Sequence, residues 1–508
     1  MLQSKSVLEF ESIRKQEFKQ GIDPYESRRK REDESFAIRK NKRAANLAKK
    51  RKSDHNIMED TDYCDIDQNE VKGIYSSNTK TVLKSLKYCR NILSYTNPPV
   101  HKLISIAPKI VEFLSAQYDP FKKHQIESTW ILINLTAGTG DETAKIVENT
   151  PVIKNLMECL ERNKTHIRLS ENLIWCLTNI AGDKEIYKNI ICEKAFYNFV
   201  QILNITVSDK KLNKESLANQ VWSLQNIVKK TNHSFSFLSR SLPVLNKVLK
   251  SCSSNLDIIA DICWSLSYIS NTAKNSDLLI FFNMGIIDEY FISLLTKNKT
   301  RMAVLRILGN CIAGPDNVSQ KVLDLGYISK LKSLDLFSHS KKNIRREITW
   351  TISNVVAGTH DQIQHIIDHN IIKDMLPLMK DEWEIRKELL YVYIHIILFG
   401  TDEQKRYILN YDCIQYFCYE LENRNSVGES IILAILKSFY QLLDYGKKTG
   451  TDKIKDMIEE FGGLDVIEQL QNCENVKIYN ESVKIIEKFY NGMEEDILYI
   501  DTIYTSFN

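Results

Sequence analysis

A tryptophan followed four residues later by an asparagine recurs along this chain at nearly constant intervals, and no other feature constrains the fold as strongly. At some positions another aromatic or polar residue replaces one member but keeps the frame. Successive first members are 45, 47, 42, 42, 44 and 41 residues apart. The seven pairs are Trp130/Asn134, Trp175/Asn179, Trp222/Asn226, Trp264/Tyr268, Arg306/Asn310, Trp350/Asn354 and Tyr391/His395. A period in the forties, carried by helical segments, is typical of an armadillo or HEAT solenoid.

Helical geometry predicts where these residues point. At about 100° per residue, Trp222 and Asn226 lie about 40° apart on one face of a helix. The apolar residues Val221, Leu224 and Ile227 centre on the opposite face. A single Trp at helical spacing is usually a core residue, but several copies turned away from the apolar stripe indicate a different role. We therefore expect a row of indoles and amides on a solvent-facing surface.

Such a row predicts a binder of extended basic peptides. An asparagine amide carries a donor and an acceptor, so it can pair with a peptide backbone regardless of side-chain identity. Neighbouring indoles leave slots for the methylene stems of Lys or Arg, with a cation–π contribution of roughly 0.5–2 kcal/mol each. Acidic groups near these slots would hold the charged tips.

Length and composition indicate an elongated intracellular protein. At 508 residues the chain exceeds one compact core, and the repeat favours an array over several domains. The 11 Cys are scattered without a CxxC pair, which is typical of reduced thiols inside cells. The longest apolar run, 389–399, is too short to span a bilayer, and no signal peptide is visible at the N-terminus. We expect a soluble protein.

The net charge of +3 is unevenly distributed. Residues 14–52 hold 15 Lys/Arg and 6 Asp/Glu, whereas the rest of the chain holds 53 and 59. A basic segment therefore precedes a mildly acidic body. Its basic clusters are Arg28, Arg29, Lys30 and Arg31, then Arg39 and Lys40, then Lys42 and Arg43, and finally Lys49, Lys50, Arg51 and Lys52. The pattern fits a segment that becomes helical on an acidic partner, and equally a solvated tail or a nucleic-acid-binding arm.

The rest of the chain divides by composition. Residues 53–77 form an acidic, flexible linker, and the helical array runs over 78–490. Two helical units without Trp, about 426–445 and 453–490, close the array. Residues 491–508 form a mixed C-terminal tail.

With these motifs assembled, the chain resembles the importin-α (karyopherin-α) family over about residues 14–490. The motifs that carry the resemblance are Asn97-Pro98-Pro99, the stretch 171–183 around Trp175, the stretches 260–268 and 306–310, the stretch 347–364 around Trp350, and 458–465 with 470–472. The resemblance implies an all-α, right-handed superhelical solenoid of about ten armadillo repeats, preceded by a flexible basic segment. It also implies a nuclear import adaptor that binds nuclear localisation signals and is not an enzyme.

The resemblance implies two binding sites for such signals. The major site would comprise Trp130, Asn134, Gly138, Thr143, Trp175, Asn179, Asp183, Trp222 and Asn226. Its most demanding lysine would be held by the Gly138 carbonyl, Thr143 and Asp183. The minor site would comprise Arg306, Asn310, Glu347, Trp350, Asn354, Glu388 and Tyr391. Tyr391 and His395 stand where the family has Trp and Asn, and we expect this departure to weaken the minor site.

The resemblance also implies the partners. Residues 1–52 would bind importin-β, and an export receptor with Ran-GTP would recycle the adaptor between cytoplasm and nucleus. When importin-β is absent, Lys49 to Lys52 could occupy the chain's own major site, because a tethered ligand has a high effective concentration. No cofactor, metal, membrane or direct nucleic-acid partner is expected.

Other interpretations fit the sequence less well. A scaffold of the β-catenin kind also binds extended peptides, but its groove is basic and its ligands are acidic. A nucleic-acid-binding protein would need basic residues on the body as well as on the segment. His365 and His369 have the i, i+4 spacing of metal ligands, yet no Cys or Glu completes a zinc motif. The stretch 445–450 resembles a phosphate loop but lacks its spacing and a preceding strand.

Overall fold

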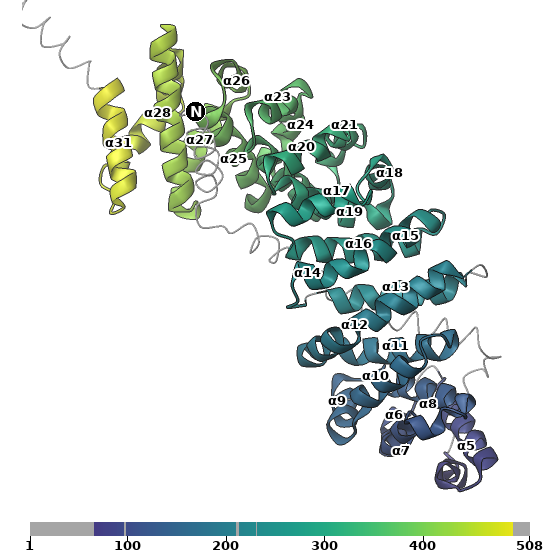
Figure 1. Ribbon diagram of the computed structural model, residues 1–508. Coiled ribbons are helices and arrows are strands. Elements are labelled where there is room, and N and C mark those ends of the chain that lie inside the picture. Colours follow the sequence, from purple (N-terminus) through teal and green to yellow (C-terminus); the bar gives the residue numbers. More distant parts are fainter. Residues whose placement is uncertain (1–65, 96–97, 210–212, 230, 491–508) are drawn as a thin grey trace, which may run out of the picture. The chain divides into compact units, whose positions relative to one another are not determined.

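The computed structural model describes residues 66–95, 98–209, 213–229 and 231–490 (Figure 1). Over these ranges the elements are α-helices and 3-10 helices, and no strand occurs among them. The chain forms two compact units with a boundary between Ile307 and Leu308, which falls inside α19 (Asn298–Ile312). We call the described parts the N-terminal unit (66–307) and the C-terminal unit (308–490). The predicted all-α fold is confirmed.

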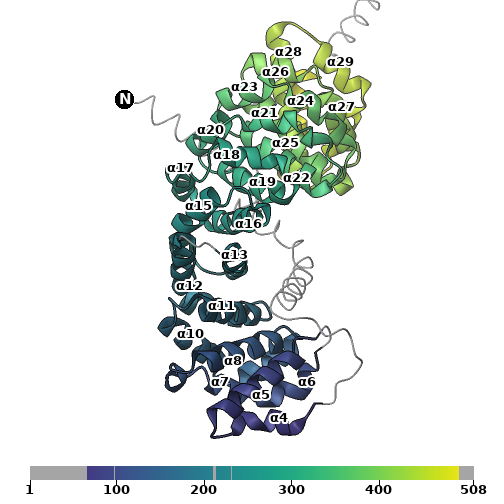
Figure 2. The same ribbon diagram turned by 90° about the vertical axis from the view of Figure 1, so that its right-hand side faces the viewer.

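Long helices form one layer of the N-terminal unit, and each packs on the next (Figures 1 and 2). They are α5 (Thr79–Ile92), α8 (Lys122–Leu135), α11 (Ile167–Ala181), α13 (Lys214–Val228) and α16 (Leu256–Thr272). We call the helices of this layer ladder helices, because the repeated pairs lie in this layer, although its first member, α5, carries no pair. Their apolar stripes are buried as predicted, since Val221, Leu224 and Ile227 are at most 1% exposed.

Shorter helices connect the ladder helices and form the second layer. In the N-terminal unit one connection is the single 24-residue helix α12 (Glu185–Ser208). The others are α4 (Gln68–Lys72), η2 (Gly73–Tyr75), α6 (Val100–Leu103), η3 (Ile104–Ile106), α7 (Ala107–Glu112), η4 (Ala116–Tyr118), α9 (Gly140–Asn149), α10 (Val152–Arg162), α14 (Phe235–Leu238), η5 (Ser239–Ser241), α15 (Leu242–Ser251), η6 (Asn275–Leu278), α17 (Leu279–Asn283), α18 (Glu289–Ser293) and η7 (Leu294–Thr296).

The C-terminal unit repeats the same plan. Its ladder helices α22 (Lys342–Val356), α25 (Trp383–Phe399), α28 (Glu429–Thr449) and α31 (Val476–Phe489) pack in that order. The connecting helices are α20 (Asp316–Asp324), α21 (Tyr327–Ser333), η8 (Leu336–Ser338), α23 (His360–Asp368), α24 (Ile371–Met375), η9 (Leu376–Lys380), α26 (Asp402–Ile408), α27 (Cys413–Glu422), η10 (Arg424–Ser426), α29 (Lys453–Glu460) and α30 (Gly463–Leu470). The stretch 445–450 is the end of α28, where Gly450 adopts a left-handed conformation.

Side-chain caps explain where many of these helices begin. Before four ladder helices, an Asn side chain accepts hydrogen bonds from two backbone amides of the first turn, which would otherwise lack partners. These residues are Asn78, Asn213, Asn255 and Asn475. The connecting helices α9, α23 and α26 begin instead with a Thr capping box, in which Glu142, Gln362 and Gln404 reach back to the cap. The Gly- and Thr-rich turns of the sequence are therefore helix starts.

The array begins earlier than residue 78. Within the predicted linker 53–77, α4 and η2 pack against α5, and Ile74 is fully buried. An ion pair of 2.5 Å between Lys84 Nζ and Glu70 Oε1 joins α5 to α4. The linker prediction is wrong from about residue 68, because α4 begins there and its Glu70 pairs with α5. The last described helix, α31, ends at Phe489, and the predicted tail 491–508 lies outside the described residues.

Across the described residues, none of the helices combines the length and apolar character that a bilayer crossing needs.

Candidate peptide-binding site

The repeated tryptophans of the N-terminal unit lie next to one another, as the ladder interpretation predicts. The ring centroids of Trp130 and Trp175 are 6.2 Å apart with planes inclined by 54°. Those of Trp175 and Trp222 are 6.4 Å apart and inclined by 69°. Aromatic rings prefer inclined, edge-to-face arrangements of this kind over a flat face-to-face sandwich. Residues 45 and 47 positions apart in sequence thus form one row across α8, α11 and α13.

The expectation that this row stands open to solvent is wrong. Trp130, Trp175 and Trp222 are only 3–7% exposed, and Asn134 and Asn179 are 1% exposed. Asn226, on α13, is intermediate in exposure. The angle calculation identified the right face of each helix but could not tell whether that face is covered.

The asparagine amides are held in a common orientation by backbone carbonyls. The Nδ2 groups of Asn134 and Asn226 donate to Trp130 O and Trp222 O, at 2.9 and 2.7 Å. Asn179 Nδ2 donates to Ile133 O on the preceding ladder helix at 3.1 Å. Asn179 Oδ1 is buried and accepts no hydrogen bond from the described residues. An unsatisfied buried acceptor is unfavourable by about 1–3 kcal/mol, so this oxygen is suited to an incoming N–H donor.

The predicted lysine pocket is divided between two neighbouring elements. Gly138 precedes α9, and a Cβ there would meet Glu142 Oε2 at 2.4 Å. Thr143 is buried in the first turn of α9, where its hydroxyl donates to Thr139 O at 3.3 Å. Asp183 lies directly after α11, and the adjacent Lys184 pairs with Glu148 of α9 at 3.5 Å. The turn that carries the carboxylate is therefore joined to the helix that carries the hydroxyl.

Two cations of the chain itself cover the next aromatic pair of the row. Trp264 and Tyr268 stack with centroids 5.8 Å apart. The Arg306 guanidinium lies 5.4 Å from the Trp264 ring, and Lys229 Nζ lies 5.8 Å from the Tyr268 ring. Both distances are typical of cation–π contacts. Sequence reasoning missed Lys229, whose only signal is its place two helical turns after Trp222.

The C-terminal unit holds the other predicted residues of the second site on α19, α22 and α25. Its Trp350 is 7% exposed. Asn354 Nδ2 donates to Trp350 O at 2.5 Å, which repeats the arrangement of the first site. The Ser353 hydroxyl lies 2.7 Å from Glu388 Oε2 and so holds that carboxylate on the face of α25. Glu347, Asn310 and Glu388 are buried. Arg306 belongs to the N-terminal unit.

The seventh pair, Tyr391/His395, is buried. Burial, and secondarily the Glu388 carboxylate, raises the pKa of Tyr391 to about 12, so its phenol stays protonated at neutral pH. The His395 ring lies 4.7 Å from the Phe399 ring and is fully buried. The predicted basic segment, with Arg28, Arg29, Arg31, Arg39, Lys40, Lys49, Lys50, Arg51 and Lys52, lies outside the described residues.

Stacked helical repeats carrying a Trp/Asn row define a class of protein, the helical-repeat adaptors. The family description "Importin beta binding domain" matches residues 14–94, and "Atypical Arm repeat" matches residues 452–502. Importin subunit alpha-3 of Arabidopsis thaliana is 30% identical over 509 residues, covering 95% of this chain and 93% of the relative. Importin subunit alpha-5 of the same plant is 30% identical over 503 residues, covering 95% and 93%.

More distant likeness agrees. Importin subunit alpha-1b of Oryza sativa subsp. japonica is 27% identical over 441 residues, covering 84% of this chain and 79% of the relative. The crystal structure of an engineered protein aligns with a TM-score of 0.65 and 18% identity, over 83% of this chain and 98% of that one, which supports the fold. The chain belongs to the importin-α family. By that membership it is a nuclear import adaptor and not an enzyme.

Proposed function

We propose that the Trp/Asn row of the N-terminal unit binds nuclear localisation signals, as extended Lys/Arg-rich peptides. The observation that carries this proposal is the buried Asn179 Oδ1, which accepts no hydrogen bond from the described residues and lies on the same helix as Trp175, the middle indole of the row. A backbone N–H of an extended peptide would satisfy this acceptor whatever the peptide's sequence. Lysine stems would lie against the indole faces. Asp183, with Thr143 and the Gly138 carbonyl, would hold one lysine tip.

Lys229 and Arg306 would limit the extent of this site. Each covers an aromatic face that a ligand cation would otherwise use. A basic peptide would therefore end before Trp264. In the C-terminal unit, Asn310, Glu347, Trp350, Asn354, Glu388 and Tyr391 would bind a second basic cluster of the same cargo.

The N-terminal basic segment, residues 1–52, would bind importin-β, in line with the family description that matches residues 14–94. That match continues beyond the basic clusters into α5, so the boundary at residue 52 stays a prediction from charge. An export receptor with Ran-GTP would return the adaptor from nucleus to cytoplasm.

The test is titration of a fluorescein-labelled extended peptide with one Lys/Arg cluster into the full chain. Asp183→Lys should lower the affinity by about tenfold or more, because it replaces an attractive charge with a repulsive one inside the site. Glu158→Lys is the matched control: it makes the same charge change at a position on α10 that is 56% exposed. Equal losses in the two variants would contradict the assignment.

A second titration uses a peptide of the same length in which Glu replaces Lys and Arg. We expect no binding, since the site offers carboxylates to the ligand. Preference for the acidic peptide would favour the β-catenin-like scaffold instead.

A further inference from the structure

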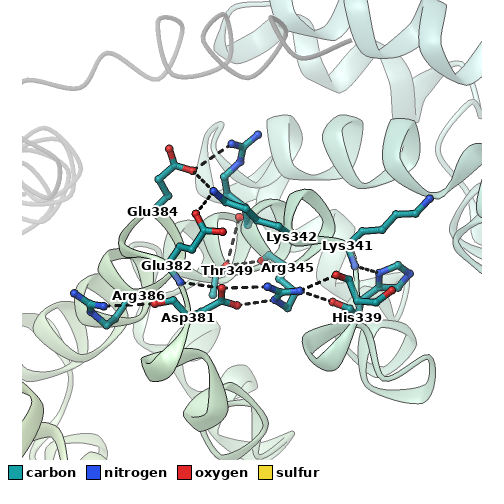
Figure 3. Close-up of polar contacts among 11 residues, drawn as sticks. His339, Lys341, Lys342, Arg345, Thr349, Asp381, Glu382, Glu384 and Arg386 are labelled. Atoms are coloured by element: carbon teal, nitrogen blue, oxygen red, sulfur yellow. Dashed lines mark hydrogen bonds and ion pairs between the residues drawn. The ribbon is translucent and has the colours of Figure 1, made fainter. Parts of the chain in front are cut away.

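A polar cluster joins the N-terminal ends of α22 and α25 in the C-terminal unit (Figure 3). It sets cations of α22 against carboxylates at the start of α25. The cations are Lys342, Arg345 and Arg346, and the carboxylates are Asp381, Glu382 and Glu384. Lys342 lies in the first turn of α22, where a cation opposes the helix dipole. The cluster has an inner and an outer part with different properties.

The inner part is structural. Arg345 grips Asp381 with two hydrogen bonds, Nε to Oδ2 at 2.6 Å and Nη2 to Oδ1 at 3.1 Å. The same guanidinium donates to His339 O at 2.7 Å. Both side chains are largely buried, at 19% and 12% exposed. The Arg345 hydrogen bond holds the pKa of Asp381 below its usual value. A two-pronged pair of this kind fixes the loop before α25.

In the outer part the two glutamates and Lys342 are exposed, whereas Arg346 is about as buried as Arg345. Lys342 pairs with Glu382 and lies 3.3 Å from Glu384 Oε2. Arg346 Nη1 lies 3.5 Å from the same Glu384 oxygen. The two glutamates are 62% and 52% exposed. The hydrogen bond from Lys342 is the main cause that lowers the pKa of Glu384. Exposed ion pairs contribute little net stability, so another cation can replace Lys342 at small cost.

The outer part lies beside the residues of the second site. Arg346 precedes Trp350 by four residues on α22, and Glu384 precedes Glu388 by four residues on α25. Each spacing is one helical turn, about 6 Å along the axis. The Ser353–Glu388 contact joins the same two helices on the side of the site. Glu384 thus lies about one helical turn from the second-site residue Glu388, and Glu382 shares the Lys342 ammonium with Glu384.

We infer that Glu382 and Glu384 form an additional binding position for a basic residue of the cargo peptide, which Lys342 and Arg346 occupy in the absence of cargo. The chain's own cations then compete with the ligand and set how many basic residues a peptide needs to bind here. This inference rests on the proposed second site. Its ligand is a Lys/Arg-rich extended peptide, because only a cation gains from the two carboxylates.

Lysines 341 and 342 provide a matched pair of variants. Figure 3 shows the side chain of Lys341 directed away from Glu382 and Glu384, while Lys342 reaches them. The probe is a fluorescein-labelled peptide with one Lys/Arg cluster, titrated into the full chain carrying Asp183→Lys so that the first site is weakened. The Lys342→Gln chain should bind the peptide about two- to five-fold more tightly than the Lys341→Gln chain. This factor corresponds to the free energy of one exposed ion pair. Equal affinities would overturn the inference.

Glu384→Gln supplies the complementary measurement. It should weaken peptide binding, and Lys342→Gln should give no gain when added to it, because the carboxylate that the lysine released is gone. Independent, additive effects of the two changes would also overturn the inference. Far-UV circular dichroism and urea midpoints of all variants check that the exposed substitutions leave the fold unchanged.

Trp350→Ala separates failure of this inference from failure of the second site. If Trp350→Ala abolishes the remaining binding while Lys342→Gln equals Lys341→Gln, the second site stands and the competition by Lys342 does not. If Trp350→Ala changes nothing, the second site and the inference fall together.

Discussion

At the scale of single residues, the close approach at Gly309 shows how tightly the second site is built. A Cβ at Gly309 would lie 2.9 Å from Thr351 Oγ1 and 3.1 Å from the Trp350 ring. Such distances are shorter than ordinary van der Waals contact, so a methyl group there would displace the indole. The glycine in this position serves the placement of Trp350 rather than a turn, since it lies inside α19.

We predict that Gly309→Ala destabilises the chain by about 1–3 kcal/mol, the usual effect of overpacking. It should also weaken binding of a peptide with two basic clusters more than binding of a peptide with one. Urea denaturation and peptide titration measure the two effects. Gly140→Ala is the control, because a Cβ there meets nothing within 4 Å. Unchanged stability and binding in Gly309→Ala would show that Trp350 adjusts without loss.

His365 gives a prediction about pH. Burial, and then the neighbouring His369 ring at 4.4 Å, lowers the pKa of His365 below 6.5, while Asp368 and Asp324 act less strongly in the opposite direction. A base with a lowered pKa binds fewer protons when folded than when unfolded. The free energy of unfolding should therefore fall as pH drops through 6.5 toward the lower folded-state pKa.

We predict that His365→Gln makes stability less dependent on pH between about 5 and about 7.5, because the substituted side chain does not titrate. Urea midpoints at the two ends of this range measure the slope. His101→Gln, at an exposed position of α6, should leave the slope as it is. A slope that persists unchanged in His365→Gln would assign the pH dependence to other groups.

The residue scale also shows what the sequence could predict. Periodicity located the Trp/Asn pairs, their shared helix face and the buried opposite stripe of Val221, Leu224 and Ile227. It could not predict that the indoles are only 3–7% exposed, because burial depends on neighbours outside the helix. Lys229 was missed for a similar reason. Its contact with Tyr268 depends on the packing of α13 against α16, which no local pattern records.

At the scale of helices, local chemistry determines most boundaries. Asn255 and Asn475 mark the starts of α16 and α31, and the caps could be expected from the sequence. The short helix α4 could not be expected from the sequence. It contains one buried apolar residue, Val71, and Asp67 in the acidic run caps it by accepting from the Asn69 amide. From sequence alone, an acidic run predicts a solvated linker, because the packing of α4 against α5 is not visible there.

Packing between helices supplies the third prediction. Arg386 Nε of α25 donates to Glu420 Oε1 of α27 at 2.6 Å, and the Glu420 side chain is fully buried. Its second oxygen has no hydrogen-bond partner among the described residues. Arg386→Met should destabilise the chain by about 3–5 kcal/mol, because it leaves a buried charge uncompensated. Urea denaturation measures this loss.

Two further variants test the cause. Adding Glu420→Leu to Arg386→Met should restore much of the stability, since both charges are then absent. Lys405→Met removes a cation whose partner, Asp402, is 67% exposed, and should change stability by less than about 1 kcal/mol. If Arg386→Met behaves like Lys405→Met, Glu420 is solvated when its partner is lost.

At the scale of the whole molecule, charge distribution carries the regulatory hypothesis. The basic segment 14–52 has 15 Lys/Arg against 6 Asp/Glu, and the remainder of the chain is net negative. A tethered Lys/Arg cluster can therefore compete with cargo for the same site. The structure shortens the tether, because α4 begins at Gln68 rather than after residue 77. Residues 53–67 can span at most about 50 Å, which raises the effective concentration relative to a longer linker.

We predict that deletion of residues 1–52 tightens binding of a single-cluster Lys/Arg peptide, because it removes the internal competitor. For a competitor held at an effective concentration on the order of mM, the gain should be at least about tenfold. Replacing Lys49, Lys50, Arg51 and Lys52 together by Gln should give most of the same gain with the segment still present. Replacing Arg28, Arg29, Lys30 and Arg31 by Gln is the matched control with the same loss of charge, and it should give a smaller gain.

The gain in affinity should shrink as salt is raised, since both the segment and the peptide are held by charge. Equal affinities for the full and shortened chains would mean that the segment does not reach the site, and equal effects of the two quadruple substitutions would mean that net charge, not a specific cluster, governs access.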